Sequence, residues 1–116
     1  MTLINELRTL DALGGDKNLL LELAKMFNED APRALINLRD AIKSENHSDV
    51  LFEVHLLKGL VSTFFAKPVV DHAQRLEEAA VIGSLELLRN GGFDEFQQNV
   101  DSMILEFQSL GWVVAP

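Results

Sequence analysis

The sequence predicts an all-α protein, an up-down antiparallel four-helix bundle with one or more additional short N-terminal helices. Apolar residues recur every three or four positions along most of the chain, which is the period of an amphipathic helix. No run alternates between apolar and polar residues as a half-buried strand does. Glycine and proline fall mostly between the periodic stretches, so the connections are short. Short connections make consecutive helices antiparallel neighbours, which is the arrangement of an up-down bundle.

Length and composition limit the number of domains and the kinds of function that the chain can have. The 116 residues are expected to form one domain over 1–116, and the 47% of hydrophobic residues suffice for one core. The chain has no cysteine, which excludes disulfides, thiolate metal ligands and thiol nucleophiles. A net charge of -8 repels phosphate backbones, so we expect no nucleic-acid partner. The N-terminus does not resemble a signal peptide and no apolar run could cross a membrane, so we expect a cytoplasmic protein that does not bind a membrane. We expect a monomer, because one bundle can bury its own core.

The first half of the chain predicts two stretches of helix. Thr2 is expected to cap a short first helix that stops at Gly14-Gly15, and Asp16 is expected to cap the next helix. Pro32 disfavours helical geometry at the residue before it, so we expect a break or kink near Asp30. The residues expected to face the core on either side of this point are Leu19, Leu20, Leu23, Met26, Phe27, Leu35, Leu38 and Ile42.

The second half predicts a helical pair followed by a final helix. Asp49 is expected to cap a helix whose core stripe consists of Val50, Val54, Leu57, Val61 and Phe64. Pro68 suits the first turn of the following helix, which continues to Gly83. A short segment at 85–88 precedes the last helix, which stops at Gly111.

The predicted helix that starts at Asp49 carries a segment of residues suited to chemistry. His55 follows the core residue Val54, so its imidazole should lie at the edge of the core stripe, partly exposed. Gly59 and Ser62 follow at i+4 and i+7 on the same face, and Lys58 lies at i+3. Glycine within a helix costs about 1 kcal/mol relative to alanine, so its presence favours close approach of another surface. Because phosphoryl transfer depends on positioning and charge neutralisation, this arrangement predicts a histidine that accepts and passes on a phosphoryl group.

A carboxylate is expected to face this histidine. His55 precedes the turn near Ala66-Lys67 by about as many residues as Glu77 follows it, so the two are level in an antiparallel pair. A carboxylate there would accept a hydrogen bond from one imidazole nitrogen and leave the other nucleophilic. Gln74, one turn before Glu77, is the alternative partner.

The segment His55-Leu56-Leu57-Lys58-Gly59 resembles the His-x-x-Lys-Gly core of histidine-containing phosphotransfer domains. Similar residues of that family also occur at 13–16, in the region 27–32 and at 76–77. The resemblance implies a four-helix bundle with added N-terminal helices. It also implies that His55 is phosphorylated on its exposed nitrogen by a phospho-aspartate receiver domain or hybrid sensor kinase. A response-regulator receiver would then take the phosphoryl group.

The resemblance also implies roles for the neighbouring residues. Lys58 would neutralise the charge of the phosphoryl group, and Gly59 would leave room for a partner to approach the imidazole. Ser62 matches a position that a small residue usually occupies. Glu77 resembles the glutamate partner found in phosphotransfer domains of chemotaxis kinases. The receiver would supply Mg²⁺, so no cofactor of the chain's own is expected.

Bulky residues mark the departures from the family. Leu60 and Val61 stand where small residues are frequent, and Phe65 stands where glycine is common. Phe52, Leu56 and Leu60 lie off the core stripe, and we expect them to form an apolar docking surface for receivers. The alternative is that flanking helices bury them.

The chain has no Walker-type loop and no kinase-type ATP motif, so it is expected to be a phosphocarrier rather than an enzyme.

Two other functions compete with phosphotransfer. A module of the same fold could dock a receiver or kinase without transferring phosphate. A metal-binding bundle would need His47, His55 and His72 to converge, but their spacing does not favour this, and His47 and His72 are expected at the surface.

Overall fold

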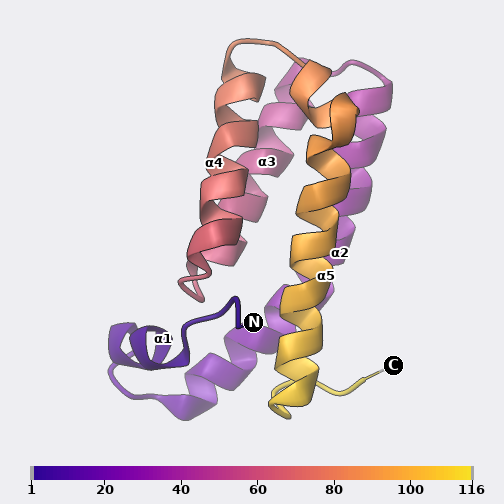
Figure 1. Ribbon diagram of the computed structural model, residues 1–116. Helices are drawn as coiled ribbons and strands as arrows, with labels where there is room; N and C mark the ends of the chain where they lie inside the picture. Colours follow the sequence, from indigo (N-terminus) through magenta and orange to yellow (C-terminus); the bar gives the residue numbers. More distant parts are fainter. Residues whose placement is uncertain (1, 116) are drawn as a thin grey trace.

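The computed structural model describes residues 2–115, and all regular elements in this range are helical (Figure 1). They are α1 (Glu6–Ala12), α2 (Lys17–Lys43), α3 (His47–Ser62), α4 (Lys67–Val81), a short kinked segment η1 (Leu88–Gly92), and α5 (Phe93–Ser109). Helices α2 to α5 run up and down as a four-helix bundle, and the short α1 lies at one end of it (Figure 1). The predicted fold class is confirmed. No helix among the described residues is long and apolar enough to span a membrane.

The core runs along the bundle axis, and a cluster of aromatic rings lies at the end near α1. The predicted stripe of α3 is buried throughout, including Phe64 just beyond the end of that helix. Phe64 meets Phe27 edge-to-face with ring centroids 5.8 Å apart, and Phe27 meets Phe107 in the same way at 5.3 Å. Trp112 stacks on Phe107 at 5.7 Å, so the C-terminal tail closes this end of the core. Such aromatic pairs stabilise a core beyond their buried area.

Side chains cap the starts of α1, α2 and α3, whereas α4 and α5 begin without a side-chain cap. Two of the predicted caps were wrong. Asp16 caps α2 as predicted, its side chain accepting a hydrogen bond from Leu19 N at 3.0 Å. Asn5, and not Thr2, caps α1. Asn46, and not Asp49, caps α3 by accepting from Asp49 N at 3.1 Å. Asparagine is as good a cap as aspartate, and Asp49 instead lies in the first turn, where a carboxylate favours the helix dipole.

Of the break or kink expected near Asp30, the break does not occur, because α2 continues through Pro32 as a single helix. An interior proline removes one backbone hydrogen bond and costs about 3 kcal/mol. Here Ala31, Ala34 and Leu35, on either side of Pro32, are buried, and α2 packs on both α3 and α5. Core packing therefore outweighs the local preference of proline.

The prediction that His72 lies at the surface was wrong as well. The side chain is buried on α4, and its ring meets the ring of Phe96 of α5 edge-to-face at 5.5 Å. The Asn99 amide nitrogen lies 3.3 Å from His72 Nδ1. His72 stands three residues after Val69 and four before Leu76, so it belongs to the buried face of α4. Burial, reinforced by the nearby Arg75 charge, lowers the pKa of His72.

Phe65, which stands where glycine is common in similar sequences, lies in the turn between α3 and α4. Its backbone has φ of 51°, in the left-handed region that bulky residues rarely adopt. The ring lies 4.6 Å from the guanidinium carbon of Arg8 on α1. The preceding Phe64 carbonyl accepts a hydrogen bond from Asn5 N at 2.9 Å. Phe64 and Phe65 therefore join α1 to the end of the bundle.

Candidate functional site

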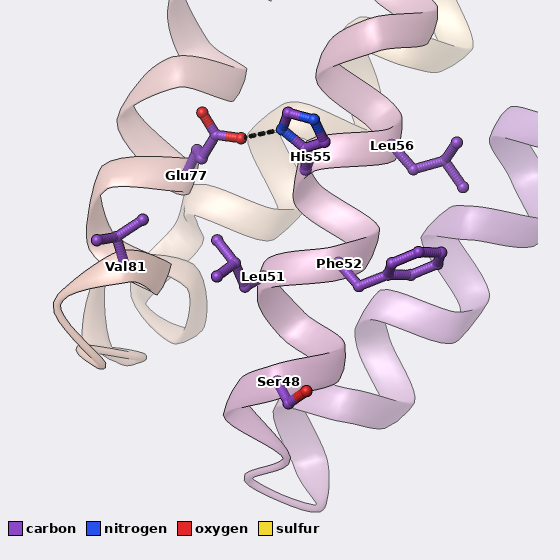
Figure 2. A pocket seen from close by; sticks show the side chains of 7 residues that line it. All are labelled: Ser48, Leu51, Phe52, His55, Leu56, Glu77 and Val81. Carbon is purple, nitrogen blue, oxygen red and sulfur yellow. Dashed lines mark hydrogen bonds and ion pairs between the residues drawn. The ribbon is translucent and has the colours of Figure 1, made fainter.

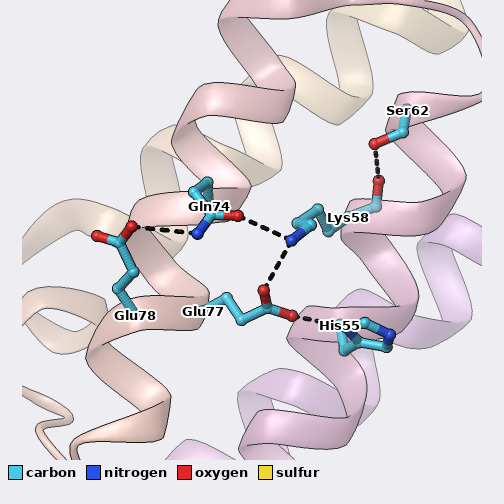
Figure 3. A network of polar contacts seen from close by, with 6 residues as sticks. All are labelled: His55, Lys58, Ser62, Gln74, Glu77 and Glu78. Atoms are coloured by element: carbon cyan, nitrogen blue, oxygen red, sulfur yellow. Dashed lines mark hydrogen bonds and ion pairs between the residues drawn. The ribbon is translucent and has the colours of Figure 1, made fainter.

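His55 projects from the middle of α3 toward solvent, beside α4 (Figure 3). Its neighbours Val54 and Leu57 are buried, which fixes the rotation of α3 about its axis. This rotation leaves 74% of the imidazole side chain exposed. The ring is thus accessible to a second macromolecule while its helix is anchored in the core.

Glu77 of α4 holds the imidazole. Its Oε2 lies 2.6 Å from His55 Nδ1, and its Oε1 accepts a hydrogen bond from Lys58 Nζ at 2.8 Å. The Lys58 bond, followed by the His55 bond, lowers the pKa of Glu77 below its usual range. An ionised carboxylate can only accept hydrogen bonds, so Nδ1 of the neutral ring carries the proton. The lone pair of the ring is then on Nε2, the nitrogen that Glu77 does not occupy.

Lys58 lies on the α4 side of the histidine and has two partners. Its ammonium donates to Gln74 Oε1 at 2.7 Å as well as to Glu77 (Figure 3). Gln74 Nε2 in turn donates to Glu78 Oε1 at 3.1 Å. The structure thus places Gln74 on Lys58 and Glu77 on both Lys58 and His55. Gln74, the alternative partner for the imidazole, bonds instead to the lysine.

Gly59 and Ser62 lie farther along the same face. A Cβ atom built on Gly59 would meet no heavy atom within 4 Å, so internal packing does not require glycine there. The Ser62 hydroxyl donates to the Lys58 carbonyl at 2.6 Å and makes no bond to the imidazole. Beside His55, α3 therefore presents a low surface that is open to solvent.

An apolar groove of about 470 Å³ begins at His55 and continues between α3 and α4 (Figure 2). Its lining consists of Ser48, Leu51, Phe52, His55, Leu56, Glu77 and Val81. Phe52 and Leu56 are 65% and 41% exposed, so flanking helices do not bury them. Leu60 is half-buried against the core and does not line the groove.

Sequence reasoning missed two groove residues, Leu51 and Val81. Leu51 stands four residues before His55 on α3, so this spacing places it on the histidine's face. Val81 is 66% exposed and stands one turn after Glu77, so the i+4 spacing was the signal that could have placed it on the same face.

Within residues 2–115, no group of three histidines or carboxylates is arranged to hold a metal ion.

We expect Glu77 to select the tautomer of His55, because its carboxylate accepts from Nδ1. Imidazole ¹⁵N chemical shifts should show the Nδ1-protonated form as the main neutral tautomer in the wild type. Glu77→Ala should shift the population toward the Nε2-protonated form. Glu78→Ala on the same helix is the matched control and should leave the tautomer unchanged. An unchanged tautomer in Glu77→Ala would show that the carboxylate does not orient the ring.

Comparison with known proteins agrees with this geometry. The Hpt domain family matches residues 22–110, which is most of the chain. No curated protein matches. The chain resembles the crystal structure of histidine-containing phosphotransfer protein B from Pseudomonas aeruginosa PAO1, with a TM-score of 0.82, 19% identity and 92% of each chain covered. That likeness shows the fold. The extent of the family match shows that the chain belongs to the Hpt domain family, phosphocarriers of two-component signalling that interact with response regulators or kinases.

Proposed function

We propose that the protein is a phosphorelay intermediate. His55 accepts a phosphoryl group from the phospho-aspartate of a receiver domain, or of a hybrid sensor kinase, and passes it to a response-regulator receiver. The observation that carries this proposal is an exposed imidazole whose Nδ1 is held by Glu77 at 2.6 Å, which leaves Nε2 as the nucleophile. Family membership supports the same chemistry. We place the reaction in the cytoplasm and expect the protein to act as a monomer.

Atoms and electrons balance in both steps of the proposed transfer. The Nε2 lone pair attacks phosphorus, an N–P bond forms, and the P–O bond to the aspartate breaks with its electron pair going to the departing carboxylate. The imidazole ring gains positive charge, which is shared with the Nδ1–H group that faces the Glu77 carboxylate. In the second transfer, an aspartate oxygen of the next receiver attacks phosphorus and Nε2 leaves.

Lys58 supplies the positive charge for the phosphoryl oxygens in this proposal. Its side chain is 28% exposed, and its ammonium is held by Gln74 and Glu77, one helical turn from His55. A lysine stem is flexible, so the ammonium can exchange one of these acceptors for a phosphoryl oxygen. Mg²⁺ is expected on the receiver, and the chain needs neither a cofactor nor an ATP site of its own.

The groove next to His55 is the proposed receiver-docking surface. Exposed apolar side chains, chiefly Phe52 and Leu56, lie directly beside the imidazole, so a partner seated there brings its aspartate to Nε2. The same groove would also serve a binding module that does not transfer phosphate, which is the second candidate function. The oriented imidazole favours transfer over simple docking.

Phosphorylation of His55 is the first test. Incubation with phosphoramidate should add one acid-labile phosphoryl group to the intact mass of the wild type. His55→Gln should show no addition, and His47→Gln, which alters an exposed histidine at the start of α3, should be labelled like the wild type. No labelling under conditions that phosphorylate another Hpt domain would refute the relay and favour the binding module.

Gly59→Ala should separate stability from transfer. Open space surrounds this position, so the new methyl group fits, and helix propensity predicts a gain of about 1 kcal/mol in the free energy of unfolding. Urea denaturation measures this gain. The methyl group occupies the approach to His55, so transfer from a phosphorylated receiver should slow while labelling by phosphoramidate continues. Unchanged receiver transfer would show that Gly59 provides no clearance.

Alanine at Phe52 or Leu56 should weaken receiver docking. Each truncation of an interface anchor typically costs about 1 kcal/mol or more, so we expect KM for a receiver to rise about fivefold or more. Circular dichroism should be unchanged because both side chains are exposed. Leu105→Ala on α5, where the side chain is 63% exposed, is the matched control. Equal KM values in all four proteins would place docking elsewhere.

A further inference from the structure

A second pocket lies on the other side of Phe52, between α2 and α3. Its volume is about 370 Å³, and its lining residues are Asn37, Asp40, Ala41, Ser44, Asp49, Phe52 and Glu53. Three of these carry carboxyl groups, and no lysine, arginine or histidine of residues 2–115 lines it. The pocket is therefore strongly acidic and separate from the polar network of His55.

Glu53 is the unusual member of this pocket. The residue is only 9% exposed, and among the described residues its Oε2 has no hydrogen-bond partner. Burial raises the pKa of Glu53, and the nearby Asp49 charge adds to this, although a contact with Asn37 opposes it. A buried carboxyl oxygen without a hydrogen-bond partner destabilises the fold, because it has lost its bonds to water and gained none in return. A cation entering the pocket would supply the missing partner.

Phe52 connects this pocket to the groove beside His55, because its side chain lines both. Figure 2 shows Phe52 projecting from α3 away from Glu77 and Val81. A receiver that covers the groove therefore also reaches the mouth of the acidic pocket. Any cationic side chain at the edge of that receiver could enter.

We propose that the pocket receives a lysine or arginine side chain of the receiver that docks beside His55. This inference rests on the proposed function and deepens it. The apolar stem of such a side chain would pack on the Phe52 ring, and its charged head would meet the carboxylates of Glu53, Asp49 and Asp40. Glu53 thus acts as a specificity residue for receivers with a basic side chain at this place, and not as a catalytic residue.

The arrangement of the carboxylates favours a side-chain cation over a metal ion. In the part of the chain that the structure describes, they do not form a group of three that could hold a metal. Asp49 Oδ2 already accepts a hydrogen bond from Asn46 Nδ2 at 2.8 Å. An ammonium or guanidinium group has several donors that can reach separate acceptors around a pocket.

The pocket itself can be tested without a receiver, using n-butylammonium chloride as a lysine analogue. In ¹H–¹⁵N spectra of the full chain, we expect saturable shifts that are confined to the amides of the pocket residues. Glu53→Gln should abolish them, and Asp101→Asn, which removes one exposed charge on α5, should retain them. Absence of shifts, or equal shifts in Glu53→Gln, would overturn the proposal. So would saturation of the same signals by MgCl₂ at lower concentration, because it would identify a metal site.

Receiver kinetics test the biological role. For a receiver that exchanges phosphate with the chain, Glu53→Gln should raise KM about tenfold and leave the saturating transfer rate and phosphoramidate labelling unchanged. Substituting the basic residues at the receiver's docking edge one at a time should reveal one whose loss has no further effect in Glu53→Gln. An unchanged KM would refute the proposal while leaving the relay intact. Failure of labelling in the wild type would refute the relay, and the n-butylammonium titration would still decide the pocket.

Stability separates this role from a structural one. Because Oε2 of Glu53 is buried without a hydrogen-bond partner, Glu53→Gln should unfold at the same temperature as the wild type or higher at pH 7. A lower unfolding temperature would show that the carboxylate holds the fold together and would contradict the proposal. Asp40→Asn, at an exposed wall of the same pocket, is a second variant that should weaken n-butylammonium binding without affecting folding.

Discussion

Burial of one face of α3 is the constraint on which the site depends. Val50, Val54, Leu57 and Val61 are all inaccessible to solvent, and they leave α3 a single rotation about its axis. That rotation directs His55 outward beside α4 and Glu53 toward α2. A rotation of one residue would bury the imidazole and expose the core. The proposed nucleophile is therefore positioned mainly by hydrophobic packing that never touches it.

Two glutamates near α3 show how environment changes the same side chain. Glu77 has two cationic or donor partners, Lys58 and His55, and these lower its pKa. Glu53 has a buried oxygen without a partner, and burial raises its pKa. Partners stabilise the charged form in the first case, and loss of water destabilises it in the second. Glu77 serves the chain's own histidine, whereas Glu53 is left ready for a charge that another molecule brings.

The surface around His55 has features that do not stabilise the isolated chain. Gly59 forgoes a methyl group for which there is space, and Phe52 and Leu56 expose apolar surface that a free protein does not need. Each feature gives up some stability in the isolated chain. Each is explained if a second protein covers this face, since its apolar surface would then be buried and the low surface at Gly59 would be filled.

Sequence alone determined the helical elements, the core stripe of α3, the exposure of His55 and its level pairing with Glu77, because periodicity and distance from a turn are local properties. Local sequence also held the signals for the asparagine caps and for Val81, although Thr2 and Asp49 were the predicted caps and Val81 was not predicted. Only the tertiary structure decided that α2 continues through Pro32, that His72 is buried, that Gln74 bonds to Lys58, and that one buried oxygen of Glu53 lacks a hydrogen-bond partner. Each of these depends on neighbours from another part of the fold, and the packing free energy that brings them together outweighs local preference.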